Sequence, residues 1–113
     1  MSKTPSRPKL VAILGAKGGV GSTFISVNLA AVVAESTTAV VADFDFCKGD
    51  VGTYLDVEPV AMIGSLLSQD TVIDEAAIRR IVVSHSAGFD ALCQPHDLAG
   101  LHAVTRDNVV TLL

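Results

Sequence analysis

The sequence lacks the features that place a protein in or across a membrane. None of its apolar runs approaches the ~20 residues that a transmembrane helix needs. The N-terminus, Met1 to Lys9, has no apolar core of the kind found in signal peptides. Cysteine is also scarce, since only Cys47 and Cys93 are present and their spacing is not that of metal ligands. We therefore expect a cytoplasmic protein with reduced thiols.

Positive charge is scarce as well. The chain has 113 residues and a net charge of −4, and three of its eight Lys and Arg residues (Lys3, Arg7 and Lys9) lie at the N-terminus. It has no basic stripe for binding nucleic acid and no basic amphipathic helix for docking on a membrane. We therefore expect no direct contact with nucleic acid and no transmembrane segment.

Apolar residues make up 50% of the chain, which is typical of a parallel sheet covered on both faces. The run Lys9–Leu14 predicts a buried parallel strand, and residues 23–35, which lack Gly and Pro, predict a helix. A second buried strand is predicted over residues 38–43. The length suits at most one domain. The predicted fold class is α/β, with a mostly parallel sheet between two layers of helices.

The remainder of the chain predicts shorter elements. These are a helix over residues 60–68, a helix over 76–83, a turn at 85–88, a strand over 89–93 and a final helix over 98–113. Asp74 and Glu75 place negative charge at the start of the predicted helix over residues 76–83. Asp97 is the expected N-cap of the predicted helix over residues 98–113.

A glycine-rich loop joins the first predicted strand to the first predicted helix. Its glycines let the backbone close around an anion, and the N-terminus of the following helix adds partial positive charge. Thr23 offers a hydroxyl to a magnesium ion that bridges two phosphates. The loop therefore predicts a binding site for the phosphates of a nucleotide, formed by Gly18, Gly19, Val20, Gly21, Ser22 and Thr23.

One position departs from the usual phosphate-binding loop, which reads Gly or Ala, four residues, then Gly-Lys-Ser/Thr. Ala16, Gly21 and Thr23 match that pattern, but Ser22 stands where the lysine is expected. An ordinary glycine-rich turn is one alternative interpretation. A dinucleotide-binding loop is another, but no window from Gly15 to Gly21 supplies Gly-x-Gly-x-x-Gly.

Two carboxylates follow the second predicted strand. Asp43 and Asp45 lie at its carboxyl end, which is the ligand-binding edge of an open parallel sheet. Side chains two residues apart share a face if the strand continues, and a bound magnesium ion would keep both carboxylates ionised. Alternatively, the two aspartates cap a helix or stabilise a loop and have no catalytic role.

The segment Lys-Gly-Gly-Val-Gly (residues 17–21) resembles the deviant Walker A loop of the ParA/MinD family of P-loop ATPases. The resemblance implies ATP and Mg²⁺ as cofactors, with Thr23 and Asp43 as metal-site residues. It also implies catalytic roles for two residues. Lys17 would reach the partner's phosphates across a nucleotide-bound homodimer, and Asp45 would contact the attacking water or the metal shell.

Three segments are similar to the CpaE/TadZ branch of that family. They are residues 15–23, Val27-Asn28-Leu29-Ala30 and residues 49–59. Those proteins help to place and assemble Flp (type IVb, tight-adherence) pili, and the branch often departs from the usual lysine. The resemblance implies pilus-assembly or secretion proteins as partners, recruitment to the cell pole or to inner-membrane pilus machinery, and weak or absent hydrolysis.

The resemblance extends from Lys9 to the end of the chain. We expect residues 1–8 to be a mobile tail and residues 9–113 to be the N-terminal half of a P-loop NTPase domain, truncated before its Walker B half. Whether ATP is hydrolysed stays open. Two alternative functions also stay open, a chromosome- or plasmid-partitioning or division-site ATPase and a non-catalytic pseudo-ATPase scaffold.

Overall fold

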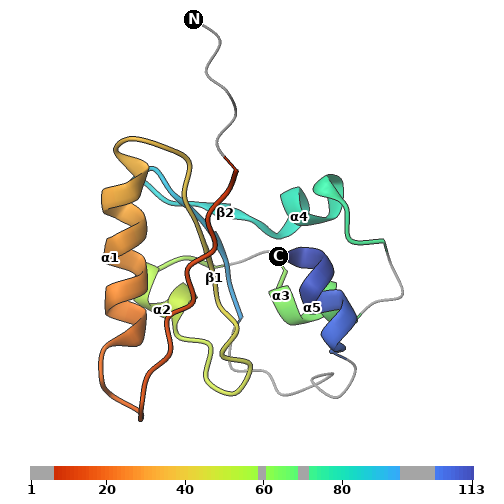
Figure 1. The fold of residues 1–113 in the computed structure, drawn as a ribbon, viewed down its shortest axis with the longest axis horizontal. Coiled ribbons are helices and arrows are strands. Elements are labelled where there is room, and N and C mark those ends of the chain that lie inside the picture. Colours follow the sequence, from red (N-terminus) through yellow and green to blue (C-terminus); the bar gives the residue numbers. More distant parts are fainter. Residues whose placement is uncertain (1–6, 59–60, 69–71, 95–103) are drawn as a thin grey trace, which may run out of the picture.

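A small mixed sheet forms the centre of the fold (Figure 1). The structure, a computed structural model, describes residues 7–58, 61–68, 72–94 and 104–113. Within these residues the strands are β1 (Val40–Ala42), β2 (Val83–Ser84) and β3 (Asp90–Leu92), in the spatial order β1-β3-β2. β1 pairs with β3 in parallel and β2 pairs with β3 antiparallel. The predicted parallel arrangement therefore holds for one pair of strands.

β3 fixes the register of the sheet, because both other strands pair with it. Ala91 lies opposite Val41 on one side and opposite Val83 on the other. The backbone N–H of Asp43 donates to the carbonyl of Leu92 at 2.9 Å, which continues the parallel pairing to the end of β1.

Five helices are found in the described part of the chain. They are α1 (Ser22–Ala34), α2 (Val51–Leu55), α3 (Ile63–Ser68), α4 (Glu75–Ile81) and α5 (Arg106–Leu112). The predicted helices near residues 23–35, 60–68 and 76–83 are confirmed to within a few residues. The acidic start of α4 is confirmed too, since Asp74 Oδ1 accepts a hydrogen bond from the N–H of Ala77 at 2.8 Å.

The helices cover both faces of the sheet, as predicted. One core cluster joins α1 and α2 to the sheet through Val27, Val51, Ala91 and Cys93, among others. A second cluster joins α3 and α4 to the opposite face through Leu67, Ile81 and Leu92, with α5 packed against it. Ala91 and Leu92 face opposite sides because side chains alternate along a strand.

The prediction of a buried strand at Lys9–Leu14 is wrong for this structure. The segment belongs to no strand, and the side chains of Leu10, Val11 and Leu14 are 70%, 65% and 91% exposed. A strand needs a ladder partner, and the backbone groups of residues 9–14 make no hydrogen bond with another described residue. β1 also departs from a fully buried strand, because Val41 is buried while Val40 and Ala42 are exposed.

Two further boundaries differ from prediction. Val83, which was expected at the end of a helix, lies in β2 and pairs with Ala91 of β3. The final helix begins at Arg106, after the cap residue Thr105, whose Oγ1 accepts a hydrogen bond from the N–H of Asn108 at 3.2 Å. The predicted cap Asp97 and the start of that predicted helix lie outside the described residues, as does most of the predicted N-terminal tail.

Candidate phosphate-binding site

The loop between the N-terminal segment and α1 requires its glycines. Gly19 (φ 76°) and Gly21 (φ 92°) adopt left-handed backbone conformations, which a residue with a Cβ atom adopts only under strain. A Cβ atom added to Gly18, Gly19 or Gly21 would meet no atom within 4 Å. The backbone of the loop is therefore open to the approach of a ligand.

The N-terminal amides of α1 have no side-chain partner in the described part of the chain. Gly21 is the N-cap residue, it provides no capping side chain, and the first turn contains no acidic residue. In each of the other four described helices a side-chain oxygen accepts a hydrogen bond from a first-turn amide. The pairs are Asp43 with Val51, Gln94 with Gly64, Asp74 with Ala77, and Thr105 with Asn108. α1 thus presents unsatisfied N–H groups behind an open glycine loop, the arrangement that binds anions.

Ser22 and Thr23 begin α1, and both are half-buried. A Cβ atom added to Gly15 would lie 2.6 Å from Ser22 Oγ, so the Ser22 hydroxyl lies against the backbone at Gly15. A lysine at position 22 would not fit in that place and would have to extend elsewhere. The carbonyl of Ser22 accepts a hydrogen bond from Ser26 Oγ at 2.7 Å.

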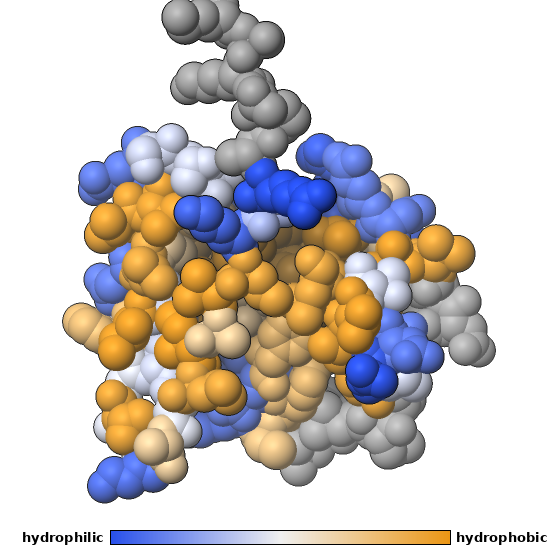
Figure 2. Space-filling model, in the orientation of Figure 1, coloured by the Kyte–Doolittle hydropathy of each residue, from blue (hydrophilic) through white to orange (hydrophobic). Residues whose placement is uncertain are grey.

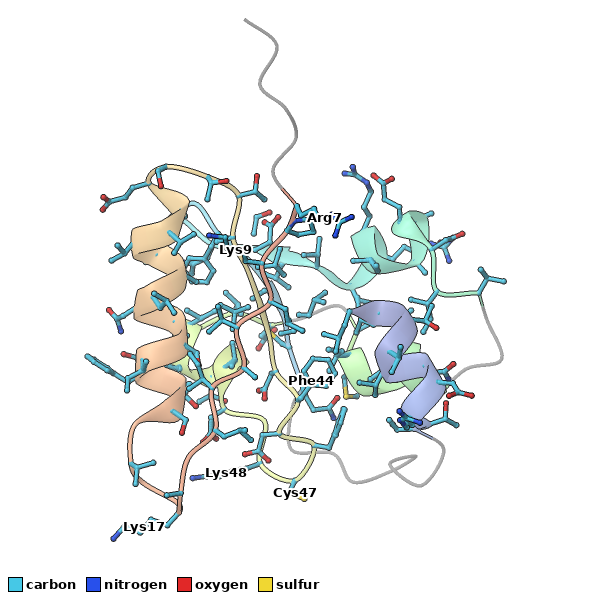
Figure 3. All side chains as sticks on the ribbon, in the orientation of Figure 1. Arg7, Lys9, Lys17, Phe44, Cys47 and Lys48 are labelled. Atoms are coloured by element: carbon cyan, nitrogen blue, oxygen red, sulfur yellow. The ribbon has the colours of Figure 1, made fainter. Side chains whose placement is uncertain are left out.

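Three labelled side chains gather at the same end of the molecule (Figure 3). Lys17 is exposed at the tip of the glycine loop and points away from the body of the protein. Cys47 and Lys48 belong to the turn after β1, and Lys48 Nζ lies 3.4 Å from Asp50 Oδ2. Sequence reasoning missed Lys48, although it follows Asp45 by three residues in the turn after β1.

Asp43 organises the turn that follows β1. Its side chain is only 5% exposed. Its Oδ1 accepts a hydrogen bond from the N–H of Asp45 at 3.0 Å, and its Oδ2 accepts one from the N–H of Val51 at 3.2 Å. Burial raises the pKa of this carboxyl group, and the two backbone hydrogen bonds oppose that rise. Asp43 therefore connects the end of β1 to the start of α2.

Asp45 is the exposed member of the pair. Its Oδ1 accepts hydrogen bonds from the N–H groups of Cys47 (3.2 Å) and Lys48 (3.0 Å), and its carbonyl accepts one from Gly49 (2.9 Å). Its Oδ2 has no partner among the described residues. One carboxylate oxygen thus shapes the turn, and the other is available at the end of the sheet.

A magnesium–phosphate site between the glycine loop and the β1 turn would need oxygen atoms from the ligand as well as from the protein. Residues 15–23 and 43–50 lie at the same end of the molecule (Figure 1). Within the described ranges, no three His, Cys, Asp or Glu side chains gather in a way that could hold a metal ion. Mg²⁺ usually binds one or two protein groups together with phosphate oxygens and water. Thr23 and Asp45 carry oxygen atoms of the kind that this mode uses, whereas both carboxylate oxygens of Asp43 already accept backbone hydrogen bonds.

Comparison with known proteins does not assign the chain. No protein-family model matches it, and no curated protein matches it. Among the helices that the structure describes, none is both long enough and apolar enough to cross a membrane. The function is therefore inferred from the fold and from the geometry of the glycine loop.

Proposed function

We propose that this chain is an ATP-binding protein of the ParA/MinD type, with a P-loop NTPase fold that resembles the CpaE/TadZ branch. One observation carries the proposal. α1 is the described helix whose first-turn amides receive no side-chain oxygen, and it follows an open loop with two left-handed glycines. A ligand phosphate would satisfy these amides and benefit from the helix dipole.

Each residue then has a chemical role. The amides of residues 18–23 hold the phosphates. Thr23 would hold Mg²⁺, which would supply positive charge to neutralise the phosphates. Asp45 orients water with its unpartnered oxygen, while Asp43 supports the metal site by fixing the turn. Lys17 extends from the tip of the loop away from the body of the protein (Figure 3), a position from which it would reach a partner's site.

Hydrolysis is expected to be slow or absent. Ser22 removes one charge-assisted contact to the β- and γ-phosphates, typically worth about 1.5–3 kcal/mol, or roughly 10- to 150-fold in affinity. Lys48 provides a cation at the same end of the molecule, although its ion pair with Asp50 and its exposure weaken its field. Backbone amides bind phosphate without the lysine, whereas fast phosphoryl transfer depends on it.

The biological role follows the resemblance. We place the protein in the cytoplasm, as a nucleotide-dependent homodimer that positions or assembles Flp pili through pilus-assembly or secretion proteins. The net charge of −4 favours this role over one in which the protein moves along DNA.

Titration of the protein with a fluorescent ATP analogue, with and without Mg²⁺, tests the proposal. We expect Mg²⁺-dependent binding that falls at least 10-fold in Thr23→Ala. Thr111→Ala is the matched control, because Thr111 lies in α5 and bonds the carbonyl of Asp107. Lys17→Ala should weaken nucleotide-induced dimerisation, and Arg80→Ala on α4 is its charge-matched control.

The same experiment separates the alternatives. Absence of binding in all variants would refute the proposal and favour the pseudo-ATPase scaffold. Fast hydrolysis stimulated by DNA or by lipid vesicles would contradict the CpaE/TadZ assignment and favour a partitioning or division-site ATPase.

A further inference from the structure

The glycine loop places no cation of its own beside the first turn of α1. Ser22 stands where a phosphate-binding loop carries its lysine, and its hydroxyl lies against the backbone at Gly15. Lys17 is exposed at the tip of the loop and points away from the body of the protein (Figure 3). Phosphates held by the loop amides would therefore need positive charge from another part of the chain.

Lys48 lies in a turn that is held beside the start of α1. The turn leads into α2, and α2 packs against α1 through the rings of Tyr54 and Phe24, whose centroids are 6.4 Å apart. Phe24 directly follows Thr23 in the sequence. The backbone of the turn is fixed, because the N–H of Lys48 donates to Asp45 Oδ1 at 3.0 Å. From this turn the Lys48 side chain extends toward the glycine loop in the view of Figure 3.

The surface at this end of the molecule is open to a charged ligand. On the face that Figure 2 shows, apolar surface covers α1 and the N-terminal segment, and hydrophilic surface appears at the lower end, beside the glycine loop. The other cationic side chains of the described residues lie elsewhere. They are Arg7 and Lys9 at the opposite end of the molecule, and Arg79, Arg80 and Arg106 on α4 and α5, which pack on the other face of the sheet.

The present partner of the Lys48 ammonium group holds it weakly. Lys48 Nζ lies 3.4 Å from Asp50 Oδ2, and the two side chains are 65% and 37% exposed. Exposed ion pairs of this kind contribute little to stability, because water and salt screen them. The phosphates of a nucleotide carry more negative charge than one carboxylate, and the flexible stem of lysine lets the ammonium group follow the stronger attraction. Lys48 can therefore leave Asp50 when a phosphate is bound.

We propose that Lys48 takes the place of the missing loop lysine and contacts the phosphates of the bound nucleotide. This inference rests on the proposed ATP site, to which it adds a binding residue from a second loop. The first turn of α1 supplies the amides, and the turn after β1 supplies the charge. A loop with Ser22 in place of lysine would keep its affinity for phosphate in this way.

Titration with a fluorescent ATP analogue and Mg²⁺ tests the role of Lys48. Lys48→Gln removes the charge and keeps the backbone hydrogen bond to Asp45, and it should lower the affinity roughly 10-fold. Lys48→Arg should stay within about 3-fold of the wild type, because it keeps the charge. Arg80→Gln, which removes an exposed cation from α4, is the matched control and should bind as the wild type does.

Two further readouts separate a phosphate contact from a structural effect. Added salt should weaken binding by the wild type more steeply than binding by Lys48→Gln, because salt screens the contact. Ser22→Lys should tighten binding more in the Lys48→Gln background than in the wild type, because both lysines would serve the same phosphates.

The outcomes distinguish this inference from the proposed function. Equal affinity and equal salt dependence in the wild type and Lys48→Gln would overturn the role of Lys48 and leave the ATP site in place. Strictly additive effects of Ser22→Lys and Lys48→Gln would overturn it as well. A wild-type protein that does not bind MgATP would overturn both this inference and the proposed function.

Discussion

Alanine substitution at two glycines of the loop should have opposite effects on stability. Gly21 has φ 92° and ψ 24°, so Gly21→Ala forces a Cβ into a left-handed conformation at a cost of about 1–2 kcal/mol. Gly18 is not left-handed, and an added Cβ meets no atom within 4 Å. Gly18→Ala should therefore leave stability unchanged or raise it by about 0.4–1 kcal/mol, because alanine restricts the unfolded chain.

Urea unfolding followed by circular dichroism measures this difference. The variants must be compared at one protein concentration, because the stability of a protein that self-associates depends on concentration. We expect the two substitutions to differ by about 2 kcal/mol, or roughly 30-fold in the folding equilibrium. Equal effects, or a loss of more than about 1 kcal/mol in Gly18→Ala, would refute the assignment of backbone strain to position 21 and of open space to position 18.

The same pair of variants separates folding from binding. In Gly18→Ala the methyl group occupies open space beside the loop backbone, where a phosphate would approach. We expect a stable protein whose affinity for MgATP is at least 10-fold lower than that of the wild type. Unchanged affinity would mean that close approach to Gly18 is not needed.

Three further predictions concern the site and its surroundings. Burial raises the folded-state pKa of Asp43 above its ordinary value of 3.8. The stability that the protonated Asp43 carboxyl group contributes is therefore fully present below pH 3.8 and is lost as the pH rises through the folded-state pKa. Urea unfolding at several pH values should thus show wild type losing stability relative to Asp43→Asn as pH rises. Ser22→Lys should restore the missing cation and tighten MgATP binding roughly 10- to 150-fold in a nucleotide titration. An alkylating reagent should modify exposed Cys47 first, because Cys93 is buried and its pKa is raised by burial and by the charge of Asp43.

Elements with strong local signals could be predicted from the sequence. α1 was predictable because it is a long run without Gly or Pro after a glycine loop. α4 was predictable because Asp74 is a good N-cap. β1 and β3 were predictable as short apolar runs between turn residues, and the turn before β3 has its Gly88 at φ 92°.

Elements that depend on distant partners could not be predicted in the same way. The run at residues 9–14 has the composition of a buried strand, but composition does not reveal whether a neighbouring strand is available. β2 has only two residues, and it forms because Val83 meets Ala91 of β3. The start of α5 depends on Thr105, a cap whose local signal is weaker than that of Asp97.

In the candidate site, too, some features could be predicted from the sequence and others could not. The glycines, Thr23 and the two aspartates could be named from their order in the sequence. The different environments of Asp43 and Asp45 could not, because they depend on α2 folding back onto the end of β1. The missing side-chain cap on α1 could not be predicted either, because distant side chains can cap a helix, as Gln94 does for Gly64 of α3.

The central claim is that the loop and the first turn of α1 bind the phosphates of ATP. Amide chemical shifts of residues 18–23, followed by NMR during titration with MgATP, test it most directly. We predict saturable shifts of these amides with MgATP and none with adenosine, which lacks phosphates. Shifts confined to other parts of the chain, or equal responses to adenosine and MgATP, would contradict the claim.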